Sequence, residues 1–249
     1  MTRLGFAANW ASIAAMATEI ELKLCLYDES DFQRVQQALD NLAHRKGTEV
    51  EVQEQTNYYL DTPLLGLRSQ RAMLRVRTFG ETALLTLKVK PVLAGGVLRA
   101  GEFEQSLPVA EIGRWLQAPP PRVLAADLGC EAWLGQGGLV DQPLADESWL
   151  HVVGAMSNTR RLYHLEGYQF NGPLGPLKVE LDHARFGLGG ADGHRYEIEL
   201  EHPDAETWQV VLDGWLSGLE VNAYPATETK YAQLLRLAAQ DRGPLATPL

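Results

Sequence analysis

The amino-acid sequence predicts a mainly β (α+β) protein in which helices cover the apolar side of a sheet whose other side is charged. Three observations support this fold class. Apolar and polar residues alternate along most of the chain, which is the period of a β-strand. Charged residues gather on one face of several predicted strands. Segments with helical spacing are few and lie between or after the strands.

The first predicted strand, residues 19–26, has two faces of opposite character. Its charged face carries Glu19, Glu21 and Lys23, and its other face is aliphatic. The same alternation returns in a predicted strand at 195–201, where the charged face carries Glu197, Glu199 and Glu201. Three like charges at period two repel one another unless a cation neutralises them. The pattern therefore indicates a cation-binding face.

Basic residues occupy one face of the strands predicted in between. Segment 71–78 places Arg71, Met73, Arg75 and Arg77 together, and segment 83–90 does the same for Thr86, Lys88 and Lys90. A Gly95-Gly96 turn leads to a strand at 101–107 that carries Glu102 and Glu104. Further strands are predicted at 49–60, near Arg160 and at 178–182. Acid-faced and base-faced strands in one chain indicate a metal site beside an anion site.

Helices are predicted at 31–44, capped by Ser30 or Asp31, at 205–219, and from about Thr229. Residues 108–150 differ in texture, with helical segments at 109–116 and 125–133 around a proline block. We expect this stretch to be an excursion outside the sheet rather than a separate domain. The predicted organisation is a tail or mis-annotated start at 1–15, one domain at 16–240, and a C-terminal tail at 241–249.

Composition narrows the possible functions. The chain has 249 residues, 45% of them hydrophobic, and a net charge of −10. This charge argues against a nucleic-acid-binding surface but not against a small anionic ligand held by local charges. No apolar run reaches the roughly 18 residues that span a membrane. The two cysteines form neither a zinc nor a disulfide pattern, so the predicted location is the reducing cytoplasm.

If the sheet closes into a barrel, all the charged faces converge on one lumen. Charges buried there must be paired or must coordinate metal ions.

The motifs on these strands resemble those of the CYTH, or triphosphate tunnel metalloenzyme, superfamily. Glu19-Ile20-Glu21-Leu22-Lys23 is similar to the ExExK signature, and Asn57-Tyr58-Tyr59-Leu60-Asp61 to a second-strand N-x-Y-[FY]-D/E segment stretched by one residue. Further matches are Leu74-Arg75-Val76-Arg77, Leu85-Thr86-Leu87-Lys88, Arg160, Glu180-Leu181-Asp182, Glu197-Ile198-Glu199 and Thr229-Lys230-Tyr231. The resemblance covers about residues 17–240 and is strongest to the bacterial inorganic triphosphatase branch.

The resemblance implies a closed eight-stranded antiparallel β-barrel tunnel with covering helices, and it assigns roles to the charged residues. Substrate-binding candidates are Lys23, Arg75, Arg77, Lys88, Arg160 and Lys230, since arginine and lysine bind phosphate oxygens. Candidate ligands of Mg²⁺ or Mn²⁺ are Glu19, Glu21, Asp182, Glu197 and Glu199, with Glu201 as a further choice. Catalytic candidates are Lys23, Glu21 and Glu199.

The implied activity is metal-dependent hydrolysis of the terminal phosphoanhydride of inorganic triphosphate by in-line attack of water. Three alternatives stay open: a class IV-type adenylate cyclase, a thiamine or nucleoside triphosphatase, and a non-catalytic polyphosphate-binding module. The number of candidate metal ligands favours an enzyme over a binding module. We expect a triphosphate-containing small molecule as partner and no nucleic acid or membrane partner, and a homodimer is one oligomeric state that the sequence leaves open.

Overall fold

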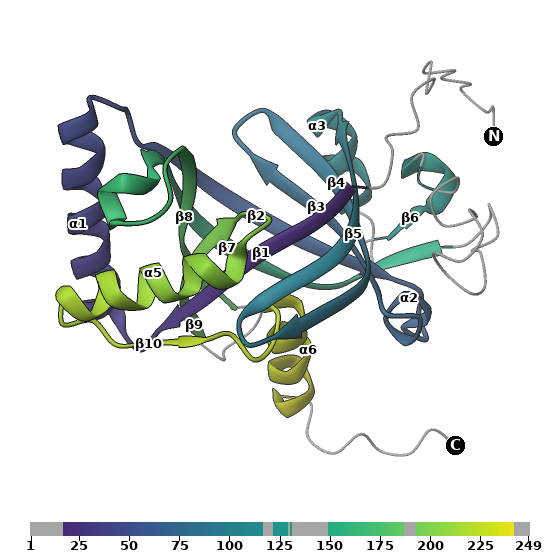
Figure 1. Cartoon of the computed structure of the whole chain (residues 1–249). Coiled ribbons are helices and arrows are strands. Elements are labelled where there is room, and N and C mark those ends of the chain that lie inside the picture. The colour runs from purple at the N-terminus through teal and green to yellow at the C-terminus, as the bar shows by residue number, and fades with distance from the viewer. Residues whose placement is uncertain (1–16, 117–121, 129, 131–148, 187–192, 242–249) are drawn as a thin grey trace.

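The structure is a computed structural model of the chain that describes residues 17–116, 122–128, 130, 149–186 and 193–241. Eight antiparallel strands form a closed barrel in the order β1-β5-β4-β3-β2-β7-β8-β9, and β9 pairs back onto β1 (Figure 1). Two short strands extend this sheet, β10 beside β1 and β6 beside β7. The predicted eight-stranded barrel is therefore confirmed.

The barrel strands are long, and most begin or end within a few residues of their predicted limits. The strands are β1 (Ala17–Leu26), β2 (Glu51–Asp61), β3 (Ala72–Phe79), β4 (Thr82–Ala94), β5 (Val97–Leu107), β6 (Arg122–Leu124), β7 (Trp149–Glu166), β8 (Pro176–Arg185), β9 (His194–Glu201) and β10 (Ala223–Pro225). The α-helices are α1 (Glu29–Lys46), α2 (Gly66–Ser69), α3 (Val109–Leu116), α5 (Ala205–Gly218) and α6 (Lys230–Asp241). Two 3₁₀ turns complete the set, η1 (Ala125–Leu128) and η2 (Gly167–Phe170).

The start of α1 differs from the prediction. Its N-cap is Asp28, in extended backbone, and not Ser30 or Asp31. The Asp28 carboxylate accepts a hydrogen bond of 2.9 Å from the backbone N–H of Asp31, which satisfies one of the free donors of the first turn. Gly47 ends the helix in the left-handed region at φ 74°, where glycine has no steric penalty.

The middle of β4 departs from simple alternation. The register with β5 shifts between Val89 and Val92, and Lys90 has a φ of 49°. This irregularity takes Lys90 to the exposed surface. The prediction that Lys90 shares a face with Thr86 and Lys88 is therefore wrong, because a period of two cannot be continued across a bulge.

The apolar side of the barrel faces outward and is covered by helices. One core lies under α1 and α5, where Phe32, Leu39 and Trp208 pack against β1, β8 and β9. A second core lies under α3, β6 and η1, which belong to the predicted excursion at 108–150 (Figure 1). Along β1, Leu22 and Leu24 point to the covered side, and Glu21 and Lys23 point to the lumen. The barrel thus has a polar interior and an apolar exterior.

Helix α6 packs across one end of the barrel in a third, smaller core. Leu234 on α6 lies so close to Gly154 on β7 that a Cβ there would be 2.7 Å from its side chain. The ring of Tyr231 stacks on that of Tyr59, with centroids 4.9 Å apart. These contacts place the first turn of α6 against the barrel wall.

Some predictions concern residues outside the described ones. These are the tail at 1–15, most of the tail at 241–249, and the part of the predicted helix 125–133 that follows η1. Among the described helices, none combines the length and the apolar character that crossing a membrane requires.

We expect Asp28→Ala to lower the free energy of unfolding by about 1 kcal/mol, because the cap of α1 is lost while the packing of the helix is kept. Asp28→Asn keeps an acceptor oxygen and is the control. Urea unfolding of the two variants and the wild type measures the difference. Equal stability of Asp28→Ala and the wild type would show that the cap contributes nothing.

Candidate functional site

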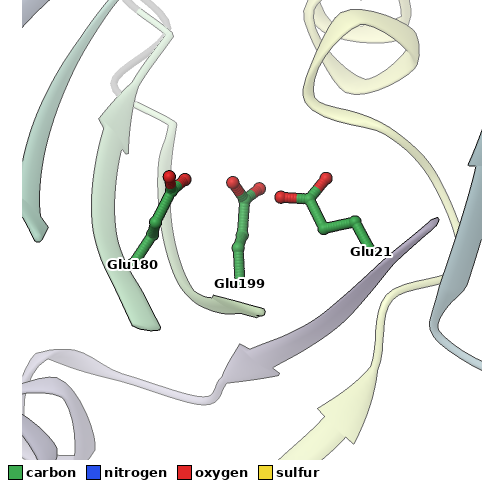
Figure 2. Close-up of side chains that lie close together, drawn as sticks. All are labelled: Glu21, Glu180 and Glu199. Carbon is green, nitrogen blue, oxygen red and sulfur yellow. The ribbon is translucent and has the colours of Figure 1, made fainter. Parts of the chain in front are cut away.

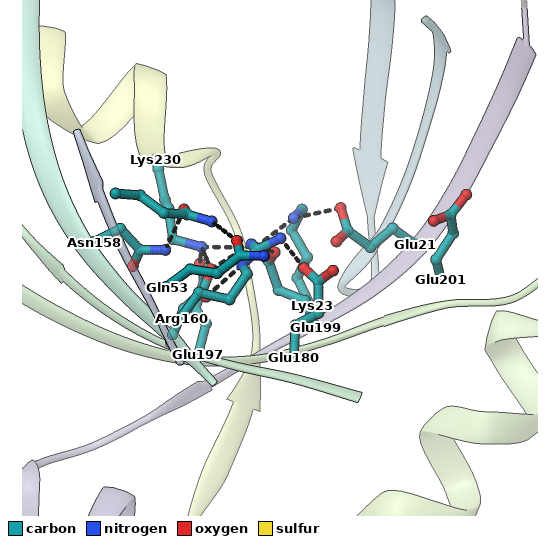
Figure 3. Close-up of polar contacts among 12 residues, drawn as sticks. Glu21, Lys23, Gln53, Asn158, Arg160, Glu180, Glu197, Glu199, Glu201 and Lys230 are labelled. Atoms are coloured by element: carbon teal, nitrogen blue, oxygen red, sulfur yellow. Dashed lines mark hydrogen bonds and ion pairs between the residues drawn. The ribbon is translucent and has the colours of Figure 1, made fainter. Parts of the chain in front are cut away.

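The barrel encloses a cavity of about 290 Å³ lined mainly by charged and amide side chains. All the residues that the sequence analysis proposed for metal or substrate binding line it: Glu19, Glu21, Lys23, Arg75, Arg77, Lys88, Arg160, Asp182, Glu197, Glu199, Glu201 and Lys230. They come from strands far apart in the sequence, and helix α6 contributes Lys230. Figure 3 shows several of them converging on the same space.

Three buried carboxylates lie together in this cavity. One oxygen from each of Glu21, Glu180 and Glu199 lies within 4.8 Å of the others (Figure 2). Glu21 lies on β1 and Glu199 on the neighbouring strand β9. Glu180 lies on the next strand, β8, directly opposite Glu199 in the ladder. Sequence reasoning named Glu180 within a motif but did not assign it to a metal. Its period-two spacing from Asp182 was the available signal.

The surroundings of Glu21 and Glu199 shift the pKa values of these two carboxyl groups in opposite directions. Burial, and next the negative charge of Glu199, raise the pKa of Glu21 to about 8. Burial also opposes the ionisation of Glu199, but Lys23, Lys230 and Arg160 outweigh it and hold the pKa of Glu199 well below its usual range. A hard divalent cation among three carboxylate oxygens would favour the ionised form of Glu21. The donor set therefore fits Mg²⁺ or Mn²⁺ better than softer metals.

The other candidate metal ligands do not belong to this group of three described carboxylates, and they too pair with cations. Both Glu19 oxygens accept hydrogen bonds of 2.5 Å from Lys88. Asp182 accepts two from Arg160, at 2.8 and 2.6 Å, and one of 2.8 Å from Lys230. Arg160 and Lys230 explain why, despite burial, the pKa of Asp182 falls to about 2.

Four cations of the described residues contact the carboxylate cluster, and one of them, Lys178, pairs with Glu180 at 3.0 Å. Lys23 is 2.5 Å from Glu21 and 2.6 Å from Glu199. Lys230 is 2.7 Å from Glu199, and Arg160 lies 2.6 Å from the other Glu199 oxygen and also pairs with Glu180. Figure 3 shows this network. Burial opposes the charge of Arg160, yet Asp182, Glu180 and Glu199 raise its pKa well above the usual range.

Two arginines on β3 donate hydrogen bonds to neutral side chains instead of carboxylates. Arg75 donates to the Thr86 hydroxyl at 3.3 Å, and Arg77 donates to the Asn57 side-chain oxygen at 3.2 Å. Neither forms an ion pair within the part of the chain that the structure describes. Burial, then the positive charges of Arg75 and Arg160, lower the pKa of Arg77 to about 10. Arg75 is buried and Arg77 is half-buried, and guanidinium groups without a carboxylate partner among the described residues are suited to binding an anion.

Two buried hydrogen-bond donors beside these arginines also lack partners among the described residues. They are the Nε of Arg75 and the Nδ2 of Asn57. Because burying an unpaired donor costs free energy, both groups indicate a ligand with acceptor oxygens. Sequence reasoning quoted Asn57 only as part of a motif, and it gave no role to Gln55 or Asn158, which also line the cavity. In the sequence, only their spacing at alternate positions along β2 and β7 indicated that these side chains face the lumen.

A closed antiparallel barrel with an acidic cluster facing unpaired arginines defines a charged-tunnel protein. The CYTH domain family matches residues 17–221, and the chain belongs to this family. In sequence, no curated protein matches the chain.

Two solved structures are similar to the chain. HpAC1 from Hippeastrum, a candidate adenylyl cyclase with a dominant triphosphatase activity, is 25% identical, with a TM-score of 0.67 over 88% of this chain and 95% of that chain. A candidate adenylate cyclase from Bacillus halodurans is 21% identical, with a TM-score of 0.54 over 88% of this chain and 98% of that chain. The similarity to the Bacillus halodurans protein supports the fold of this chain and nothing further.

The raised pKa of Glu21 predicts a specific pH dependence of stability in metal-free protein. Between the usual carboxyl pKa of 4.5 and about 8, the folded state keeps a proton that the unfolded state has lost. The stabilisation from this proton is complete below 4.5 and is lost as the pH rises to about 8. We expect Glu21→Gln to lack this fall.

Urea unfolding across that pH range, with EDTA present, measures the effect. The control is Glu201→Gln, because Glu201 stands opposite Glu21 in the ladder but is 58% exposed at its side chain. Parallel stability profiles for the wild type and Glu21→Gln would contradict the prediction.

Proposed function

We propose that this protein hydrolyses the terminal phosphoanhydride of inorganic triphosphate in a metal-dependent reaction. The observation that carries this proposal is the pairing of a three-carboxylate cluster with two arginines, Arg75 buried and Arg77 half-buried, that have no acidic partner among the described residues. A polyanion that carries a divalent cation satisfies both halves at once. The dominant triphosphatase activity of the similar protein HpAC1 supports the same chemistry.

We assign Glu21, Glu180 and Glu199 to the metal, which is Mg²⁺ or Mn²⁺. When bound, the metal neutralises phosphate oxygens and so lowers the charge that develops on the transferred group. We assign Glu19, Asp182 and Glu197 to holding Lys88, Arg160 and Lys230 in place, because each of these acids contacts a cation and none of them belongs to the three-carboxylate cluster found among the described residues. This division changes the ligand set that the family resemblance implies.

Arg75 and Arg77 are the proposed primary phosphate ligands, because their guanidinium donors have no competing carboxylate. The other four candidates already have carboxylate partners, which keep them charged before a phosphate approaches. These four are Lys23, Lys88, Arg160 and Lys230. All six residues therefore present positive charge to the same cavity before substrate arrives. Such preorganised charge is the main source of rate acceleration in phosphoryl transfer.

The proton of the attacking water goes to Glu21 in this proposal. Without metal, burial and next the charge of Glu199 raise the pKa of Glu21 to about 8; a bound cation would lower this pKa, so that the carboxylate is ionised and can take the proton. Lys23 holds the Glu21 carboxylate at 2.5 Å and orients it. Glu199 stays ionised and positions the water through a hydrogen bond.

The size and lining of the cavity support inorganic triphosphate over larger substrates. Its volume of about 290 Å³ is at the lower end of small-molecule sites, which typically measure about 300–1,000 Å³. Its two aromatic rings, Tyr59 and Tyr231, stack on each other rather than presenting a face to a base. Adenylate cyclase, nucleoside triphosphatase and thiamine triphosphatase activities are the alternatives that the substrate assay separates.

Arg75→Met is expected to reduce kcat/KM for tripolyphosphate by about 10²- to 10³-fold, since one charged donor to the transferred group is lost. Folding should be unimpaired, because the variant removes an unpaired buried donor. The control is Arg99→Met, which removes an exposed arginine that pairs with Glu206 outside the cavity.

Phosphate release from tripolyphosphate, ATP and thiamine triphosphate is measured with Mg²⁺, Mn²⁺ or EDTA, and cyclic AMP is assayed on the ATP sample. Fast, metal-dependent release from tripolyphosphate with slow release from ATP is the expected result. Formation of cyclic AMP, or turnover confined to ATP or thiamine triphosphate, would replace the proposed substrate. Tight binding of tripolyphosphate without turnover would make the protein a binding module.

Glu180→Gln tests the metal assignment separately. Removing one of three anionic ligands is expected to raise the Mg²⁺ or Mn²⁺ concentration for half-maximal activity by at least about tenfold. Glu166→Gln is the control, because Glu166 pairs with Lys46 outside the cavity at 2.9 Å. An unchanged metal requirement in Glu180→Gln would remove Glu180 from the ligand set.

A further inference from the structure

Arg195 on β9 has no role in the reaction proposed above, yet it is buried and makes three polar contacts. It is 8% exposed. Its guanidinium donates to the Gln233 side-chain oxygen at 2.8 Å and to the backbone carbonyl of Glu228 at 2.8 Å. It also donates to the Glu197 carboxylate. A single side chain therefore links β9 to α6 and to the loop before it.

Each of the three partners of Arg195 either lies close to Lys230 in the sequence or contacts its side chain. Glu228 precedes Lys230 by two positions in the chain, and Gln233 follows it by three. The third partner, Glu197, itself forms an ion pair with the Lys230 ammonium group. Arg195 thus fixes the backbone before Lys230, the helix after it, and a carboxylate that contacts its charge.

The start of α6 lies between two hollows, and its own polar contacts with the barrel include the ion pairs of Lys230 with Asp182, Glu197 and Glu199. On one side is the barrel cavity, which Thr229, Lys230 and Tyr231 line. On the other is a second cavity of about 430 Å³, lined by Arg195, Gln233 and Arg236 among others. The apolar contacts of Tyr231 and Leu234 hold one face of the helix. Arg195 supplies the polar restraint on the opposite side.

We propose that Arg195 is a positioning residue for Lys230: it pins the first turn of α6 to β9 so that the Lys230 ammonium group stays in the barrel cavity. The part of this inference that concerns triphosphate rests on the function proposed above. A lysine at position 195 would keep the charge but would not reproduce the forked geometry that reaches three acceptors. Shape as well as charge is therefore required.

The exposed Arg236 provides a matched control. It also lies on α6, and it also binds Glu228, but through the Glu228 side chain at 2.7 Å. Its side chain is 49% exposed. Arg236→Met therefore removes the same charge and an α6 contact without touching the link to β9.

The experiment compares Arg195→Met, Arg195→Lys, Lys230→Met, the Arg195→Met/Lys230→Met double variant and Arg236→Met. Two quantities are measured: kcat/KM for tripolyphosphate, and amide hydrogen exchange of residues 233–238 in protein without substrate. We expect Arg195→Met to lower kcat/KM by at least about tenfold. The double variant should be no more than about threefold worse than Lys230→Met, since Arg195 acts through Lys230. Arg195→Lys should restore little, and Arg236→Met should be within about twofold of wild type.

Hydrogen exchange at 233–238 should quicken by at least about tenfold in both Arg195 variants and stay unchanged in Arg236→Met. Equal exchange in Arg195→Met and Arg236→Met, or additive losses in the double variant, would overturn the inference. Gln233→Ala keeps the buried Arg195–Glu197 pair and is the mild substitute if Arg195→Met does not fold. It should also quicken exchange at α6.

The two readouts keep this inference distinct from the proposed function. If wild-type protein neither binds nor hydrolyses tripolyphosphate, the proposed function fails, and the exchange data alone decide whether Arg195 pins α6. If wild-type protein turns over tripolyphosphate but Arg195→Met behaves like Arg236→Met in both assays, only the positioning role fails.

Discussion

Charge balance inside the barrel is the constraint on which the rest of the structure depends. Moving an ion out of water costs several kcal/mol, and only a close opposite charge offsets this cost. Arg160 meets this requirement with Asp182 on the neighbouring strand β8, and Lys88 on β4 meets it with Glu19 on β1, one strand further away. Arg75 and Arg77 do not meet it. The imbalance is localised on one strand, β3, and it faces the carboxylate cluster on the other side of the cavity.

Because the interior of the barrel is polar, the apolar burial that stabilises the fold occurs on the outside of the barrel. The leucines that alternate with the charges on β1 and β8 point outward, where α1 and α5 bury them with Phe32 and Trp208. The segment between β5 and β7 covers the other side through Ile112, Val123 and Leu128. Because apolar burial is the main favourable term in folding, the helices are as necessary to the tunnel as its strands.

Sequence reasoning was most successful where one strand carries its own pattern. The two faces of β1 and β9 follow from period two alone, and so does the convergence of their charges once the sheet closes. Lys90 was misplaced because a bulge depends on how β4 pairs with β5. The grouping of Glu180 with Glu21 and Glu199 depends on the stagger of three strands. Arg195 had no visible role because two of its partners, at positions 228 and 233, lie 33 and 38 residues further along the chain, in the loop before α6 and on α6.

The pairing of β9 with β1 joins parts of the chain that are synthesised far apart in time. Lys23 meets Glu199 across this seam, at a separation of 176 residues. Until β9 is present, Lys23 lacks Glu199 and the barrel wall is open beside β1. The ring therefore cannot close before residues 194–201 have been synthesised. Lys230, which also lines the cavity, follows β9 in the chain, so the site is completed only after the ring.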